Sequence, residues 1–329
     1  MRNLGILQSS TSETRKCPVL QHGVRQLSGT ACKATPFRPS VRKQGSKDSK
    51  FKPKKSLGQN FLTDDALLQS IAAAARLQPG DRVLEIGPGK GSLTQQLLQA
   101  GASVLAVEKD ARLVKQLQSS YGQRADFRVI EEDFLTLDLS QASQLHPAKA
   151  HGRLIAAGNL PYYITTETIK KLLPWGHTFS ALHFVIQDDA AKRLVSPDAS
   201  EVRAINVEID FYSEPKYLFK IDKARFSPEP TVDGALVHFE LRQPSEYLLT
   251  EGRTSFMKLV QHAYLQRRKM LRKSLESLYS RAQLDKAQER LGSKCSLAAR
   301  PQELSMAHLV HIFTVLQEAK HSTFMSDQS

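Results

Sequence analysis

The sequence predicts an α/β protein, with a doubly wound and mostly parallel sheet followed by a small all-helical C-terminal domain. Three observations support this. Short apolar runs alternate with amphipathic stretches from residue 82 to residue 195, a glycine-rich turn at 87–91 follows the first run, and the pattern becomes helical after Pro244. Strands that alternate with helices form parallel sheets with right-handed crossovers. The glycine-rich turn further indicates a Rossmann-like, nucleotide-binding sheet.

The elements follow in order along the chain. A helix is expected over 64–76, because Thr63 or Asp64 can cap it and Leu67, Leu68 and Ile71 repeat at helical spacing. Apolar runs predict strands, and the stretches between them predict helices. The expected strands are 82–86, 103–108, 127–133, 153–159 and 181–187, and the expected helices are 91–101, 110–119, 164–173 and 188–195.

Two further segments, "INVEIDFY" at 205–212 and "GALVHFEL" at 234–241, lie close together without a long helix between them. We expect them to form an antiparallel pair at one edge of the sheet. The segments 255–279 and 305–319 have apolar residues at helical spacing, so each is expected to be helical. These segments make up the predicted C-terminal domain.

The net charge of +13 is unevenly distributed. Residues 1–50 hold 10 Lys and Arg against 2 acids, together with 11 Ser and Thr, and show almost no hydrophobic periodicity. This composition is typical of an organelle transit peptide; the alternative is a disordered basic arm that binds nucleic acid. The predicted organisation is therefore a transit peptide at 1–50, a Rossmann-like sheet domain at 51–244, and a helical domain at 245–329.

Cysteine and histidine patterns exclude several classes of site. The three cysteines have neither metal-ligand nor disulfide-framework spacing, and the ten histidines are scattered. We expect a reducing compartment and no metal. No apolar run approaches the ~18 residues needed to cross a bilayer, so we expect a soluble protein without a membrane partner.

The turn "VLEIGPGKG" places Gly87, Gly89 and Gly91 between a strand and a helix. Such glycines allow a nucleotide to approach the backbone, and Glu108, at the end of the next strand, can bind a ribose diol. The third glycine comes one residue too early for a dinucleotide fingerprint. Glu85 also favours a cationic cofactor over a pyrophosphate. Both features favour S-adenosylmethionine over NAD. Asp133, which closes the third strand, can bond the adenine amine of that cofactor, and the ordinary alternative for it is a loop or cap acid.

The stretch "NLPY" follows the fourth strand, where ligands of parallel sheets bind. The exocyclic amine of an adenine is a poor nucleophile and must be positioned accurately. The Asn159 side-chain carbonyl and the Leu160 backbone carbonyl could accept its two hydrogens and direct the nitrogen toward a methyl carbon. Tyr162 could stack on the base after the base has left any helical stack. The ordinary alternative is an Asn-x-Pro turn with core tyrosines.

Five ordered motifs resemble the ribosomal RNA adenine dimethyltransferase family: "LGQNFL" (57–62), "EIGPGKG" (85–91), "NLPYYI" (159–164), "FSPEPTVDGALV" (226–237) and "AYLQRRKMLRKSL" (263–275). The resemblance covers nearly everything from residue 53 onward. It implies S-adenosylmethionine as cofactor and dimethylation of N6 on two adjacent adenines in the hairpin near the 3′ end of small-subunit rRNA. The implied partners are that rRNA and the pre-small ribosomal subunit, with the enzyme acting as a monomer.

The resemblance also assigns residues. Phe226 would stack on the target base opposite Tyr162, although core packing at a strand entry is the alternative for this ring. The residues that would contact the cofactor are Asn60, Leu62, Gly87, Glu108, Asp133 and Asn159.

The sequence departs from the family pattern in two places. A "F-x-P-P-P-K-V-D-S" pattern reads "FSPEPTVDG" here, and residues 194–215 lack a glycine-rich stretch usual in bacterial members. The second departure resembles the plastid branch, so we expect a chloroplast protein, with the mitochondrion as the alternative. Two other functions stay open: a mitochondrial transcription-factor-like relative, and an antibiotic-resistance methylase that acts on large-subunit RNA.

The segment "LQRRKMLRKSL" carries five cations and no acid. On one continuous helix these cations would form a basic strip, while Leu265, Met270, Leu271 and Leu275 would pack inward. We expect RNA phosphates to bind there, and the ordinary alternative is a solvated helix face. The members of the strip assigned to RNA are Arg268, Arg272 and Lys273.

Overall fold

The computed structural model describes residues 58–141, 152–249, 251–292 and 295–326. The predicted transit peptide at 1–50 lies outside these residues. The described residues form a seven-stranded sheet with the order β4-β3-β2-β5-β6-β9-β7. Its strands are β2 (Arg82–Ile86), β3 (Ser103–Glu108), β4 (Phe127–Glu131), β5 (Leu154–Asn159), β6 (Ala181–Gln187), β7 (Ser213–Ile221) and β9 (Gly234–Leu241).

The strands from β4 to β6 run parallel, and β9 pairs antiparallel with both β6 and β7. A further short pair joins β1 (Phe61–Leu62) to β8 (Phe226–Ser227) beside the main sheet. The carboxyl ends of β2, β3, β4 and β5 therefore meet at one edge, where the sequence placed its glycine loop and its polar residues. The α/β fold class is confirmed.

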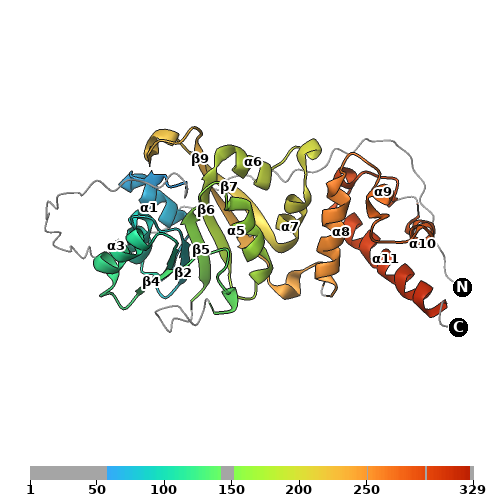
Figure 1. Ribbon diagram of the computed structural model, residues 1–329, viewed down its shortest axis with the longest axis horizontal. Helices are drawn as coiled ribbons and strands as arrows, with labels where there is room; N and C mark the ends of the chain where they lie inside the picture. The colour runs from blue at the N-terminus through green and yellow to red at the C-terminus, as the bar shows by residue number, and fades with distance from the viewer. Residues whose placement is uncertain (1–57, 142–151, 250, 293–294, 327–329) are drawn as a thin grey trace, which may run out of the picture. The chain divides into compact units, whose positions relative to one another are not determined.

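Helices cover both faces of the sheet. Neighbouring residues of one strand point to opposite faces, so Val83 packs in one hydrophobic cluster and Leu84 in the other. The first cluster includes side chains of α1 (Asp65–Ala74), α2 (Ser92–Gln99) and α3 (Ala111–Tyr121), and the second includes α5 (Thr165–Leu172) and α6 (Asp188–Val195). In Figure 1, α1 and α3 flank the sheet on one side and α5 lies on the other. This arrangement is the predicted doubly wound sheet.

The prediction for 205–212 is wrong: this segment is a helix, α7 (Ala204–Tyr212), and the edge strand is the segment that follows it, β7. The side chain of Asn206 explains the difference. Its oxygen accepts a hydrogen bond from the Arg203 backbone N–H, and its amide donates to the carbonyls of Arg193 and Leu194 at the end of α6. These bonds cap the start of α7 and satisfy the end of α6, which a strand at this place would leave unpaired.

The chain after β9 is helical, as predicted, in α8 (Arg253–Leu265), α9 (Leu271–Leu275), α10 (Arg281–Leu291) and α11 (Met306–Ser326). The second cluster continues into these helices through α7, where the rings of Phe211 and Phe256 lie 5.4 Å apart. The described residues accordingly all belong to one compact unit.

The expected single helix over 255–279 is interrupted between α8 and α9. The backbone N–H groups of Leu271 and Arg272 donate to the carbonyls of Ala299 and Leu297, and not to carbonyls four residues earlier. Met270 has an extended ψ of 144°. Tertiary hydrogen bonds therefore replace one turn of helix, and the basic residues 267–269 lie in the exposed connection.

Candidate active site

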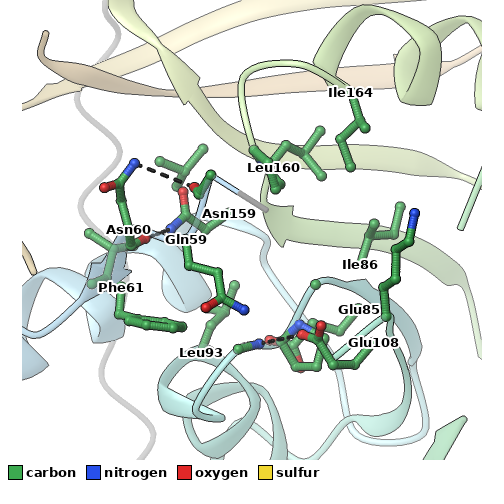
Figure 2. Close-up of a pocket in the computed structure, with 18 of the residues that line it drawn as sticks. Gln59, Asn60, Phe61, Glu85, Ile86, Leu93, Glu108, Asn159, Leu160 and Ile164 are labelled. Atoms are coloured by element: carbon green, nitrogen blue, oxygen red, sulfur yellow. Dashed lines mark hydrogen bonds between the residues drawn. The ribbon is translucent and has the colours of Figure 1, made fainter. Parts of the chain in front are cut away.

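A pocket opens at the carboxyl edge of the sheet, where the predicted site residues come together (Figure 2). It is lined by β1, by the glycine loop after β2, by the ends of β3, β4 and β5, and by β8. Asn60 and Asn159 lie on one side of it, and Glu85 and Glu108 on the other. The sequence-predicted residues that line it are Asn60, Leu62, Gly87, Glu108, Asp133, Asn159, Leu160, Tyr162 and Phe226.

The glycine loop has a backbone that only glycine adopts easily. Gly87 and Gly89 have φ of +65° and +60°. A Cβ on Gly89 would lie 2.9 Å from the ring of Phe61, which packs against the loop, whereas a Cβ on Gly87 would meet nothing within 4 Å. The loop thus presents bare backbone to the pocket, as a nucleotide site requires.

Glu108 is fixed at the end of β3 by two backbone N–H groups. Gly89 donates to Oε2 at 3.2 Å, and Asp110 donates to Oε1 at 2.8 Å. The side chain is buried, and burial raises the pKa of its carboxyl. Each oxygen keeps a lone pair, so this carboxylate can accept hydrogen bonds from two adjacent hydroxyl groups.

Glu85 differs in its charge state from the carboxylate that the sequence suggested. It is fully buried on β2, and burial raises its pKa to about 8. At neutral pH the group is therefore mostly protonated in the protein alone. Thr94 donates to its Oε2 at 2.6 Å, while Oε1 has no hydrogen-bond partner among the described residues. A buried oxygen without a partner beside a pocket is suited to a cationic ligand, and so the residues present fit S-adenosylmethionine.

Asp133 lies directly after β4 and lines the pocket. Its Oδ1 accepts a hydrogen bond from the Leu135 backbone N–H at 3.0 Å, and its Oδ2 pairs with the Lys109 ammonium at 2.7 Å. The bond from Lys109 holds the pKa of Asp133 below its usual value. Because this pair is partly exposed to solvent, Oδ2 can exchange its partner at small cost.

Asn159 ends β5, and its orientation is set by the backbone of Asn60. Its Nδ2 donates to the Asn60 carbonyl at 2.8 Å. A carbonyl oxygen only accepts, so this bond determines which end of the amide is the nitrogen and leaves Oδ1 for another donor. The next residue, Leu160, is buried and donates its backbone N–H to Val185.

Tyr162 and Phe226 line the same pocket from separate elements. Tyr162 is the last residue of the NLPY turn and is 38% exposed, while Phe226 is 6% exposed and pairs with Leu62 across β8 and β1. Phe226 is therefore packed in the core and faces the pocket as well. Core packing and stacking on a target base are thus compatible for this ring.

The basic strip differs from the prediction. Leu271 and Leu275 are buried as expected, but Leu265 and Met270 are exposed. The five cations do not share one helix, because Arg267, Arg268 and Lys269 lie in the connection between α8 and α9.

The three cations assigned to RNA also differ in their partners. Arg272 pairs with Asp285 at 2.7 Å, and Lys273 pairs with Glu276 at 3.1 Å. In the described part of the chain, Arg268 has no ion pair. The two ion pairs are surface pairs that phosphate could displace.

Sequence reasoning missed two pocket residues that act through others. Phe61 supports the glycine loop, and Lys109 pairs with Asp133. The motif "LGQNFL" contained the first, but its contact with Gly89 depends on the fold. Lys109 follows Glu108 directly, and nothing in the sequence links it to Asp133.

The described ranges contain no group of three His, Cys, Asp or Glu side chains placed to bind a metal ion. Among the same residues, no helix combines the length and apolar character needed to span a membrane.

Comparison with known proteins identifies the family. The ribosomal RNA adenine dimethylase model matches residues 50–318. A chloroplastic ribosomal RNA small subunit methyltransferase of Arabidopsis thaliana is 39% identical, covering 80% of this chain and 79% of that protein. Ribosomal RNA small subunit methyltransferase A of Protochlamydia amoebophila is 35% identical, covering 82% of this chain and 93% of that protein.

The crystal structure of the 23S rRNA methyltransferase ErmE is similar with a TM-score of 0.58 at 26% identity, covering 78% of this chain and 100% of that one. Sequence and fold agree with the pocket geometry. The chain belongs to the ribosomal RNA adenine dimethylase family and is an S-adenosylmethionine-dependent rRNA adenine dimethyltransferase.

Proposed function

We propose that this enzyme dimethylates N6 of two adjacent adenines in the 3′-terminal hairpin of organellar small-subunit rRNA. The observation that carries the proposal is the orientation of Asn159. Its amide nitrogen is bound to the Asn60 carbonyl, so its oxygen is left for the amine of a base that enters the pocket. An acceptor held in this way can position a weak nucleophile.

Each pocket residue then has a role. Bound S-adenosylmethionine supplies a reactive methyl group on a sulfonium. The Asn159 side-chain carbonyl and the Leu160 backbone carbonyl hold the target amine in line with it, which is the main contribution to the rate. Tyr162 and Phe226 hold the two faces of the flipped base. The nitrogen loses its extra proton to water after each transfer, so no strong base is needed.

The cofactor contacts follow from the same geometry. Glu108, with both oxygens fixed by backbone N–H groups, binds the ribose hydroxyls. Asp133 accepts from the adenine amine, and Gly87 gives the cofactor access to the loop backbone. The remaining contacts come from the β1 side of the pocket and from β5, through Asn60, Leu62 and Asn159.

The small-subunit substrate is proposed from the relatives, because the proteins of Arabidopsis thaliana and Protochlamydia amoebophila are both named as small-subunit methyltransferases. The chloroplast is proposed because the former is chloroplastic and residues 1–50 have the composition of a transit peptide. We assign residues 51–244 to methyl transfer and 245–329 to RNA contact in a monomeric enzyme, with Arg268, Arg272 and Lys273 on phosphates. The pre-small subunit is then its partner in ribosome biogenesis.

The test uses the purified protein, S-adenosylmethionine and three transcripts. These are the 3′-terminal hairpin of chloroplast small-subunit rRNA, the same hairpin with guanines in place of its adjacent adenines, and a large-subunit rRNA domain. We expect dimethyladenine in the first transcript alone. Methylation confined to the large-subunit RNA, or of none of the three transcripts, would overturn the proposed hairpin substrate.

A further inference from the structure

Lys171 on α5 makes an unusual set of contacts next to the pocket. Its ammonium donates to three backbone carbonyls, those of Phe134 at 2.8 Å, Leu135 at 2.7 Å and Leu137 at 2.6 Å. It also lies over the Phe134 ring, 5.2 Å from the centroid. An ammonium has three N–H donors, so all of them are used by one short stretch of backbone.

That stretch is a single helical turn that begins at Asp133. The Asp133 side chain accepts from the Leu135 N–H, and its carbonyl accepts from the Thr136 N–H at 3.0 Å. The acid thus caps the start of the turn, and Lys171 binds three carbonyls along it, the last being that of Leu137. A turn of this length has too few internal hydrogen bonds to be stable alone. Its conformation therefore depends on the two caps.

Lys171 is not a member of a surface ion pair. Within the described ranges its ammonium bonds no carboxylate, and burial lowers the pKa of Lys171, an effect that the nearby Asp133 and other acids partly offset. The adjacent Lys170 differs, since it pairs with Glu167 at 3.5 Å on the surface of the same helix. The two lysines therefore make a matched pair for comparison.

We infer that Lys171 is a positioning residue that orients Asp133 and thereby sets the selectivity of the pocket for a 6-amino purine cofactor. This inference rests on the proposed cofactor role of Asp133. The turn holds Oδ1 of Asp133 through the Leu135 N–H, so the carboxylate keeps its direction when Oδ2 exchanges the Lys109 ammonium for the amine of the cofactor. Lys171 also connects the turn after Asp133 to the segment that contains Asn159, because its helix, α5, begins directly after NLPYYI.

The test compares two cofactor analogues by titration calorimetry. S-adenosylhomocysteine carries the 6-amino group, and S-inosylhomocysteine has an oxygen in its place. We expect the wild type to prefer the former. Lys171→Met should bind S-adenosylhomocysteine about tenfold more weakly, the scale of a lost hydrogen bond to a charged group, and S-inosylhomocysteine nearly unchanged. Lys170→Met should keep the wild-type preference.

Additional variants separate the inference from the function on which it rests. Lys171→Gln, which keeps two N–H donors, should lose part of the preference and guards against a misfolded Met variant. Thermal melting confirms the fold of each. Wild-type preference in either folded variant overturns the inference. In that case Asp133→Ala decides which proposal has failed. If Asp133→Ala also keeps the preference, the proposed role of Asp133 fails as well. If Asp133→Ala loses the preference, the role of Asp133 stands and only that of Lys171 fails.

Discussion

Replacing Asn159 by Ala removes an acceptor that acts at the transfer step. A neutral hydrogen bond contributes about 1 kcal/mol, and a small misplacement of a reacting group costs on the order of 100-fold in rate. Because the bond to the Asn60 carbonyl holds the Asn159 amide in one orientation, both effects are lost together. We expect turnover to fall by at least ~100-fold, or about 2.7 kcal/mol.

The assay is single-turnover methylation of the hairpin transcript at saturating S-adenosylmethionine. Asn60→Ala is the matched control, because the bond to Asn159 uses the backbone carbonyl of residue 60 and survives the change. It should weaken cofactor binding and leave the saturated rate close to wild type. Asn159 is only partly buried at a strand end, so its removal leaves no core cavity. A near-wild-type rate for Asn159→Ala would refute the positioning role.

Four other changes test separate parts of the site. Glu108→Ala should weaken S-adenosylmethionine binding by about 1.5–3 kcal/mol in calorimetry, with hairpin affinity unchanged. The pKa of Glu85 is about 8 and a cationic cofactor lowers it, so binding near pH 7 should release a proton, seen as a buffer-dependent heat that Glu85→Gln lacks. Arg268→Ala should flatten the slope of log RNA affinity against log salt by roughly 0.7–0.9, whereas Lys258→Ala, an exposed change on α8, should not. Burial lowers the pKa of His183 to about 4, so the unfolded chain binds an extra proton between pH 6.5 and pH 4. The free energy of unfolding, measured with urea, should therefore fall by up to about 1.4 kcal/mol per pH unit as the pH drops through that window. His183→Gln should remove this contribution to the pH dependence.

The sheet could be predicted because its strands are buried on both faces and its helices on one. A short, almost continuous apolar run such as "SVLAVE" predicts a strand buried on both faces, and all six of its residues are buried. The site could be predicted because glycines, acids and amides follow these strands directly. Parallel strands bring their carboxyl ends to one edge, so sequence order alone placed Gly87, Glu108, Asp133 and Asn159 around one pocket.

The errors have a common cause in tertiary hydrogen bonds. "INVEIDFY" alternates apolar and polar residues as a strand does, yet Asn206 joins it to the end of α6 and makes it a helix. The connection from Lys109 to Asp133 and that from Lys171 to the turn after Asp133 span 24 and 34 to 37 residues. No local pattern contains contacts of this kind.

The break between α8 and α9 bears on the proposed contact of this region with RNA. A continuous helix would present its cations as a strip along a groove, with their charges spaced by the helical repeat. The exposed connection instead puts Arg268 and Lys269 beside the exposed side chains of Leu265 and Met270. A short projecting segment of this kind can contact few phosphates, while its apolar residues can reach an unstacked base or a sugar. Most of the charge-dependent affinity of the region should therefore come from Arg268 and Lys269, and less from Arg272 and Lys273, which must first leave their acidic partners.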